Sequence, residues 1–146
     1  MSDPFETHSG TIPESYRDIL EKPSFAHLAT TSQSGWPQSS PVWVDHEDGE
    51  AILLNTRKGR QKERNIRDDP RVSVSVVDPE DPYRYLAVRG EATLTEEGAT
   101  EHIDELAQKY LGVEEYPHHD EEDEPRVIIR IPAEHVIIRG RDQREE

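Results

Sequence analysis

The sequence predicts a mainly β protein, a small barrel of roughly six antiparallel strands with flanking helices. Short blocks of alternating or β-branched residues recur along the chain, as in RVSVSVVD at 71–78. Turns of a few residues separate most blocks, and such turns are too short for a parallel crossover. The 146 residues are expected to form one domain at 11–140, between flexible tails at 1–10 and 141–146.

Each element follows from a local pattern. Residues 11–22 predict a helix, because Thr11 and Glu14 have capping-box spacing and Pro13 suits a first turn. Residues 96–112 predict the strongest helix, with one apolar face and Gly112 to end it. The predicted strands cover residues 24–32, 37–45, 51–56, 71–78, 83–95 and 126–140.

Prolines and glycines refine the strand prediction. The first three strands are expected to form an antiparallel meander, since short turns join them. Pro41 cannot donate to a ladder and therefore marks an edge or a bulge. Gly90 predicts a bend or a close approach of two backbones, and Pro132 predicts a bend in the last strand.

Charge is distributed unevenly. The formal net charge is −15, from 32 acidic residues against 13 arginines and only 4 lysines. Such a surface opposes nucleic acid and anionic membranes, because basic contacts to phosphate dominate those affinities. Molar salt would screen the self-repulsion of this surface. We therefore expect a halophilic protein that binds neither nucleic acid nor membranes, the alternative being an ordinary acidic surface.

Several chemistries are not expected. The sequence has no cysteine, and the GxxxxGKS/T, GxGxxG and GxSxG motifs are missing. His118 and His119 are adjacent, so they are not expected to converge on one metal ion. The first residues have neither the basic end nor the apolar core of a signal peptide, and no apolar run approaches the length of about 20 residues that spans a bilayer. A cytoplasmic location is expected.

One short stretch gathers the positive charge. Residues 55–71, NTRKGRQKERNIRDDPR, carry seven cations against three acids, so the stretch is +4 and the remainder −19. Residues 59–68 can form a helix, in which Ile66 is the one aliphatic side chain. Like charges spaced four apart cost about 0.2–0.5 kcal/mol a pair. The cations therefore require counter-charge, either from the protein's own acids or from an anion bound where the loop enters the helix.

Trp43 lies two residues after Pro41 in the second predicted strand. A tryptophan here either joins the core or forms the wall of a site for a flat ligand. Because Pro41 leaves nearby backbone groups outside the ladder, those groups could meet the polar edge of such a ligand.

The order of the motifs resembles a known family. Across residues 12–139 the chain shows GWPQSSPVWV, then ILLNTRKGRQKERNIRDDPRVSVSVVD, PYRYLAVRGEATL, a helix and RVIIRIPAEHV. This order is similar to the pyridoxamine 5'-phosphate oxidase-like split-barrel superfamily, and more narrowly to its class of coenzyme F420 (deazaflavin)-dependent enzymes. The resemblance implies a homodimeric, six-stranded antiparallel split β-barrel that holds FMN or F420 in a groove at the dimer interface.

The resemblance also implies which residues bind the cofactor. The strand that contains SPVW would line the ring, largely through main chain, and the segment NTRKGRQK would bind the phosphate. The loop after the fourth strand would approach the ring. Arg64, Arg67 and Arg71 are instead expected to pair with the protein's own acids. The expected cofactor-binding residues are Pro41, Val42, Trp43, Asn55, Thr56, Arg57, Arg60, Lys62, Asp78 and Pro79.

The implied function is hydride transfer between bound FMN or F420 and a small organic substrate. The catalytic residues are unknown, although Tyr83, Arg84 and Tyr85 could face the substrate. Seven cations exceed the needs of the single FMN phosphate, which favours the deazaflavin and leaves FMN open. The alternative is a non-catalytic flavin- or haem-binding module for storage or redox sensing. Since the chain ends at Glu146, without the C-terminal extension of the oxidase proper, pyridoxamine-phosphate oxidation is not expected.

Overall fold

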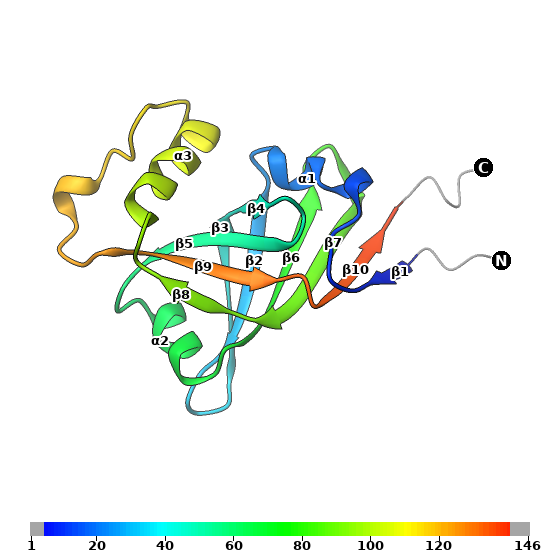
Figure 1. Cartoon of the computed structure of the whole chain (residues 1–146), viewed down its shortest axis with the longest axis horizontal. Coiled ribbons are helices and arrows are strands. Elements are labelled where there is room, and N and C mark those ends of the chain that lie inside the picture. Colours follow the sequence, from blue (N-terminus) through cyan, green and yellow to red (C-terminus); the bar gives the residue numbers. More distant parts are fainter. Residues whose placement is uncertain (1–4, 141–146) are drawn as a thin grey trace.

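The computed structural model describes residues 5–140, which form two antiparallel sheets with helices around them (Figure 1). One sheet has six strands in the order β1-β10-β7-β6-β2-β3, and the other has four in the order β4-β5-β9-β8. The strands are β1 (Phe5–His8), β2 (Phe25–Thr31), β3 (Pro37–Trp43), β4 (Asp45–Glu47), β5 (Ala51–Arg57), β6 (Arg71–Asp78), β7 (Asp81–Glu91), β8 (Thr93–Thr95), β9 (Arg126–Pro132) and β10 (His135–Arg139). The predicted fold class, a mainly β split barrel with flanking helices, is confirmed.

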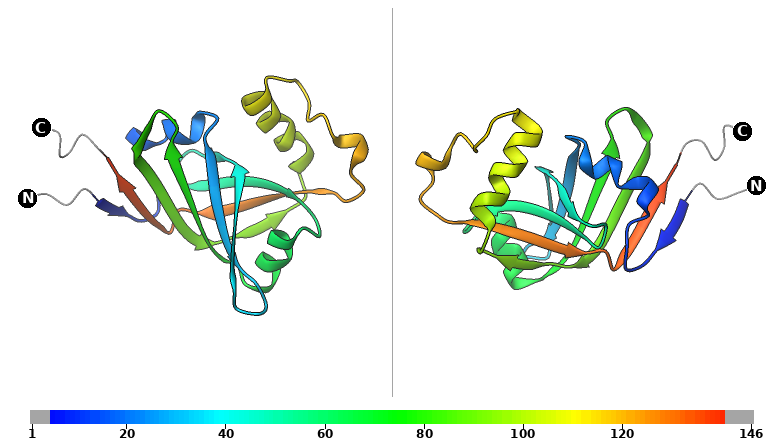
Figure 2. Two further views of the ribbon diagram at one scale, coloured as in Figure 1. Left: turned by 180° about the vertical axis from the view of Figure 1, so that it is seen from behind. Right: turned by 45° about the horizontal axis from the view of Figure 1, so that its top comes forward.

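Two predicted long strands each divide where the chain passes from one sheet to the other. The first gives β7 and β8, and the second gives β9 and β10, with its break just after Pro132. A Cβ on Gly90 would lie 2.4 Å from the Pro132 carbonyl oxygen, so only glycine fits at this corner. The predicted bends at Gly90 and Pro132 are therefore confirmed, and together they bring the two sheets face to face (Figure 2).

The predicted meander of the first three strands is wrong. β2 and β3 pair from Phe25–Trp43 to Thr31–Pro37, but β5 pairs with β4 and β9 in the other sheet. The chain changes sheets at Val44, whose N–H donates to the Tyr110 hydroxyl (2.9 Å) and whose carbonyl accepts from Lys109 Nζ (2.7 Å). These side chains satisfy the backbone at the corner. Pro41 lies on β3, which is an edge strand, as predicted.

The N-terminal region also differs from the prediction. Residues 5–8 were expected in a flexible tail, but they form β1 and pair with β10 from Phe5–Arg139 to His8–Val136. Residues 1–4 and the predicted tail at 141–146 lie outside the described residues. The expected helix at 11–22 is two short pieces, η1 (Glu14–Tyr16) and α1 (Asp18–Glu21). No side chain caps η1, and Thr11 Oγ1 instead accepts a hydrogen bond from Arg17.

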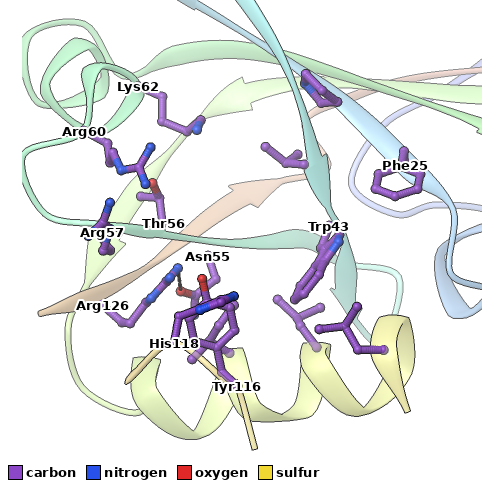
Figure 3. A pocket seen from close by; sticks show the side chains of 15 residues that line it. Phe25, Trp43, Asn55, Thr56, Arg57, Arg60, Lys62, Tyr116, His118 and Arg126 are labelled. Carbon is purple, nitrogen blue, oxygen red and sulfur yellow. Dashed lines mark hydrogen bonds between the residues drawn. The ribbon is translucent and has the colours of Figure 1, made fainter. Parts of the chain in front are cut away.

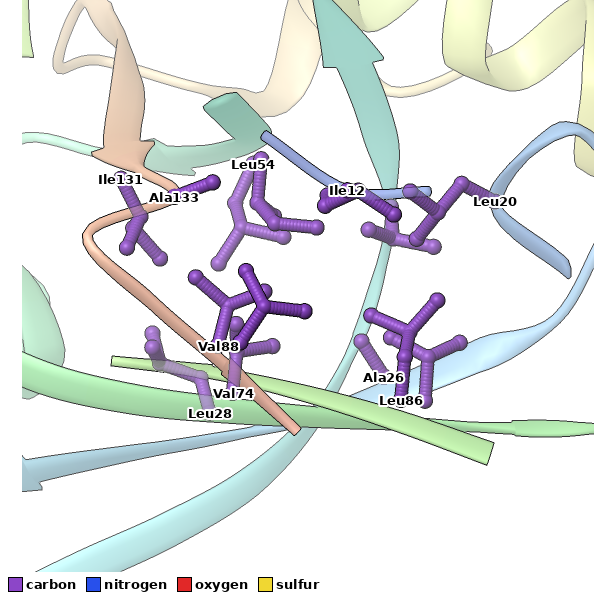
Figure 4. Close-up of a cluster of buried hydrophobic side chains, with 14 of the residues drawn as sticks. Ile12, Leu20, Ala26, Leu28, Leu54, Val74, Leu86, Val88, Ile131 and Ala133 are labelled. Atoms are coloured by element: carbon purple, nitrogen blue, oxygen red, sulfur yellow. The ribbon is translucent and has the colours of Figure 1, made fainter. Parts of the chain in front are cut away.

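The core lies between the two sheets and is closed at one end by residues 12–20 (Figure 4). Its largest fully buried side chains are aliphatic and come from both sheets and from the N-terminal segment 12–20. Burying each such side chain contributes about 1.5–3 kcal/mol. They include Ile12, Ile19, Leu20, Leu28, Ile52, Leu54, Leu86, Ile129 and Ile131.

Two helices flank this barrel. α2 (Gln61–Asp68) lies in the basic stretch and packs against β2 and β8. α3 (Ala99–Leu111) packs against β5 and β9 and ends at Gly112 with φ 72°, as predicted. The loop after α3 contains one short turn, η2 (His119–Glu121). Within residues 5–140, none of the helices has the length and apolar character that a bilayer crossing requires.

Candidate functional site

A cavity of about 500 Å³ opens between β3, β5, the start of α2, α3 and the loop 113–125 (Figure 3). Eight of the ten residues expected at a cofactor site line it: Pro41, Val42, Trp43, Asn55, Thr56, Arg57, Arg60 and Lys62. Cationic side chains gather on one side, and Trp43 and Phe25 lie on the other (Figure 3). The cavity therefore has a charged part and an aromatic part, with Asn55 between them.

The charged part has few internal counter-ions. The side chains of Arg60 and Lys62 make no ion pair or hydrogen bond with any residue in the range 5–140. Arg57 Nε is buried without a hydrogen bond, and its nearest acid is Glu122, 3.9 Å away. Burial, and then the neighbouring charges of Arg60 and Arg126, lower the pKa of Lys62. A bound anion would supply a partner for these cations and would favour the charged form of Lys62.

The other cations of the basic stretch have partners of their own. Lys58 pairs with Glu96 at 3.2 Å, Arg67 with Glu63 at 2.8 Å and Arg71 with Asp69 at 2.8 Å. Arg64 donates to the Gly59 carbonyl and to the Gln61 side chain. None of these four cations lines the cavity. The stretch thus divides into cations held by the protein and cations directed at the cavity.

Polar side chains explain why α2 is stable with only one aliphatic residue. Glu63 is 2 % exposed, and its Oε1 accepts the backbone N–H of Gly59 at 2.8 Å. Asn65, also 2 % exposed, donates to Thr30 Oγ1 and to Gln38 Oε1 on β2 and β3. Glu63 therefore ties the loop that carries Arg60, between β5 and α2, to the helix, and Asn65 ties the helix to the barrel.

The aromatic part is built around Trp43. Its ring stacks on Tyr110 with a centroid distance of 5.0 Å and an interplanar angle of 10°, and Tyr116 meets it edge-on at 6.5 Å. The Tyr110 hydroxyl donates to the Ser24 carbonyl, and burial raises the pKa of that hydroxyl to about 12. Trp43 is therefore neither a core residue nor freely mobile. It is a wall of the cavity held from behind by α3.

The loop 113–125 and the start of β9 add residues that were not expected at a cofactor site from the sequence. Arg126, which follows this loop, lies over the Tyr116 ring at 4.6 Å and donates to Glu122 through Nε and Nη2. Although burial opposes it, the hydrogen bond from Arg126 lowers the pKa of Glu122. His118 lines the cavity, while His119 is held by Asp104 at 2.6 Å. The described residues contain no group of three or more potential metal ligands.

Asp78 and Pro79, the remaining two expected residues, do not line this cavity. Asp78 is 5 % exposed and accepts hydrogen bonds from Lys22 and Arg84, each at 2.9 Å. Arg84 also donates to both carboxylate oxygens of Asp18. Arg84 therefore belongs to an ion-pair cluster with Asp18 of α1 and Asp78 of β6. Neither it nor the neighbouring Tyr83 and Tyr85 lines the cavity.

The fold is a split barrel, and its cavity has a cationic side and an aromatic side. Residues 12–140 match the family of pyridoxamine 5'-phosphate oxidase. A solved F420 reductase is 37 % identical, with a TM-score of 0.72 over 85 % of this chain and 98 % of that chain. A conserved hypothetical protein of Mycobacterium tuberculosis is 27 % identical, with a TM-score of 0.69 over 90 % and 87 % of the two chains.

A HupZ protein of Group A Streptococcus shares the fold at 22 % identity, with a TM-score of 0.64 over 86 % of this chain and 91 % of that chain. The chain belongs to the pyridoxamine 5'-phosphate oxidase family, because the family match spans nearly all of it.

Proposed function

We propose that the protein is an oxidoreductase that binds FMN or coenzyme F420 in this cavity and reduces or oxidises a small organic substrate. Membership of the oxidase family and the similarity to an F420 reductase support this function. The observation that carries the proposal is the pair of cations, Arg60 and Lys62, that face the cavity without an internal counter-ion. A cofactor phosphate supplies the missing charge.

The residues fit such a cofactor. Arg57, Arg60 and Lys62 would hold the phosphate, through charge-assisted hydrogen bonds that contribute about 1.5–3 kcal/mol each. Pro41, Val42 and Trp43 would line the ring, with main-chain groups of the edge strand facing its polar rim. When bound, a flavin or deazaflavin supplies hydride transfer. The protein contributes position and exclusion of water, and no side chain of the cavity is required as an acid or base.

Four cations at the cavity, counting Arg126, exceed the needs of one phosphate. Glu122 neutralises part of this charge through Arg126 and Arg57. The remaining excess favours F420, whose tail carries several negative charges, over FMN. Both cofactors should therefore be titrated side by side.

We further propose that two copies assemble over this cavity. Phe25 and Leu111 line it, yet they are 55 % and 51 % exposed, and Trp36 at the β2–β3 turn is 77 % exposed. Apolar exposure of this kind marks surfaces that another chain covers. Sedimentation equilibrium should give twice the chain mass, and a monomer at micromolar concentration would contradict the assembly.

The binding claim is tested by titrating FMN and F420 into the wild type and into Lys62→Ala and Arg60→Ala. Loss of one charged hydrogen bond should weaken the affinity by about tenfold to a hundredfold. Lys58→Ala is the matched control, because Lys58 belongs to the same stretch but pairs with Glu96 outside the cavity. Equal affinities in all four proteins would refute the site.

Turnover is tested separately. Reduced F420, or reduced FMN, is offered with a panel of quinone and enone acceptors, and oxidation of the cofactor is followed by absorbance. Acceptor-dependent oxidation supports the enzyme. Tight binding without oxidation by any acceptor would favour the non-catalytic module instead.

A further inference from the structure

The Asn55 side chain has a defined orientation in the cavity wall. Its Nδ2 donates to the Ala99 carbonyl at 2.9 Å, and its Oδ1 accepts from Arg126 Nη1 at 3.3 Å. A carbonyl can only accept and a guanidinium can only donate. If the amide were flipped, its oxygen would face the Ala99 carbonyl oxygen and its NH2 group would face the Arg126 guanidinium, so neither hydrogen bond could form. The two contacts favour the oxygen on the Arg126 side, and the third polar neighbour of the amide is His102.

This orientation determines the state of a buried histidine. Asn55 Nδ2 also lies 3.1 Å from Nδ1 of His102, which is 6 % exposed on α3. Because Nδ2 is a donor, Nδ1 must accept, and the neutral ring must carry its proton on Nε2. Nε2 lies 3.4 Å from Asp45 Oδ2 and makes no hydrogen bond within residues 5–140. The Asp45 carboxylate therefore favours a proton on Nε2 through its charge.

We propose that His102, aided by Asp45, is a positioning residue that holds the Asn55 amide with its oxygen available as an acceptor in the cavity. Asn55 lies between the cations and Trp43 (Figure 3), so it faces the middle of a ligand whose ring and phosphate occupy the two ends. The ligand class that this oxygen recognises is one whose ring-to-phosphate linker carries hydroxyl donors. This inference deepens the proposed function and rests on it for the ligand.

The alternative is that His102 only fills space beneath α3. The two roles differ in one respect, which is the need for an acceptor at the Nδ1 position. Leucine has a similar volume and no acceptor. Asparagine is smaller but can place its side-chain oxygen near the Nδ1 position. A packing role therefore favours leucine over asparagine, whereas the positioning role favours asparagine.

The experiment titrates FMN into the wild type, His102→Leu and His102→Asn. We expect His102→Leu to weaken the affinity about five- to tenfold, as for one hydrogen bond, and His102→Asn to restore it to within about twofold of the wild type. His46→Leu is the control, because His46 is half-buried and, like His102, hydrogen-bonded, but it contacts Glu21 and Gly49, away from the cavity. Unchanged affinity in His102→Leu, or equal weakening in both His102 variants, would overturn the proposal.

A second measurement needs no ligand. Nitrogen-15 NMR of the free protein, at a pH above the ordinary histidine range, reports which ring nitrogen of His102 is protonated. The proposal requires Nε2, and a proton on Nδ1 would overturn it. Failure of the proposed function would appear elsewhere, as unchanged cofactor affinity in Lys62→Ala and Arg60→Ala.

Discussion

Replacing Glu63 by alanine should loosen the phosphate-binding loop and destabilise the barrel together. The carboxylate is 2 % exposed and accepts from the Gly59 N–H at 2.8 Å and from Arg67 at 2.8 and 3.0 Å. A hydrogen bond to a buried charged acceptor contributes about 1.5–3 kcal/mol. The Arg67 side chain is 51 % exposed, so its share is at most about 1 kcal/mol. The expected loss is about 2–3 kcal/mol.

For a domain of this size, 1 kcal/mol corresponds to about 3–4 °C in melting temperature. Calorimetry of Glu63→Ala should therefore show a decrease of about 6–12 °C. Glu63→Gln is the matched variant, since it keeps an acceptor for Gly59 but not the charge, and about half the decrease is expected. FMN affinity should fall in Glu63→Ala, because Arg60 directly follows Gly59 on the released loop. A melting temperature within about 2 °C of the wild type would refute the reasoning.

Three further predictions concern salt and pH. Added KCl should raise the melting temperature, because the net charge of −15 repels itself at low ionic strength, and a flat response would contradict a halophilic surface. In the folded protein burial opposes the ionised form of Asp78, but hydrogen bonds from Lys22, the Glu80 N–H and Arg84 outweigh it and lower the pKa below 3.8, and the pKa of Asp18 is lowered mainly by Arg84. The stabilisation from these two carboxylates is therefore present above pH 3.8 and is lost as the pH falls through their pKa values in the folded protein. Melting temperatures measured between about pH 5 and 2 should depend less on pH in Asp78→Asn than in the wild type. As the pH is raised, FMN affinity should begin to fall at a pH lower than 10.5, the ordinary pKa of lysine, because Lys62 has a lowered pKa and binds the phosphate only when protonated. Lys62→Arg should abolish this pH dependence.

Local patterns predicted a large part of this structure. The apolar face of 96–112 and Gly112 predicted α3, and the alternation of 71–78 predicted β6, because both patterns reflect burial of one face. The excess of positive charge predicted the cationic side of the cavity, and Arg67 and Arg71 pair with acids as expected. Arg64 was also expected to pair with an acid, but it donates to the Gly59 carbonyl and the Gln61 side chain instead.

The missed residues depend on pairing between distant segments. Arg126 lies opposite Arg57 through the register of β9 on β5, and it contacts Asn55 from 71 positions away in sequence. Two like charges opposite each other in a sheet are unfavourable, and Glu122, which lies beside both arginines, offsets their repulsion. The predicted meander failed for the same reason. Alternation of apolar and polar residues identifies a strand but does not indicate which of the two sheets the strand joins. The change of sheet occurs at Val44, where side chains from α3 form hydrogen bonds with the backbone.

The two prolines of β3 have a consequence for aggregation. Pro37 and Pro41 pair with Thr31 and His27, on an edge strand with no further neighbour among the described strands. Proline is tolerated there only where its nitrogen points away from β2. Backbone N–H groups two residues apart point the same way, so residues 37, 39, 41 and 43 all face away from β2. Two of these four positions are prolines and have no N–H to donate. A concentrated salt solution would remove the charge repulsion that keeps these acidic molecules apart, but a strand from another molecule would still find this edge a poor template for fibre growth.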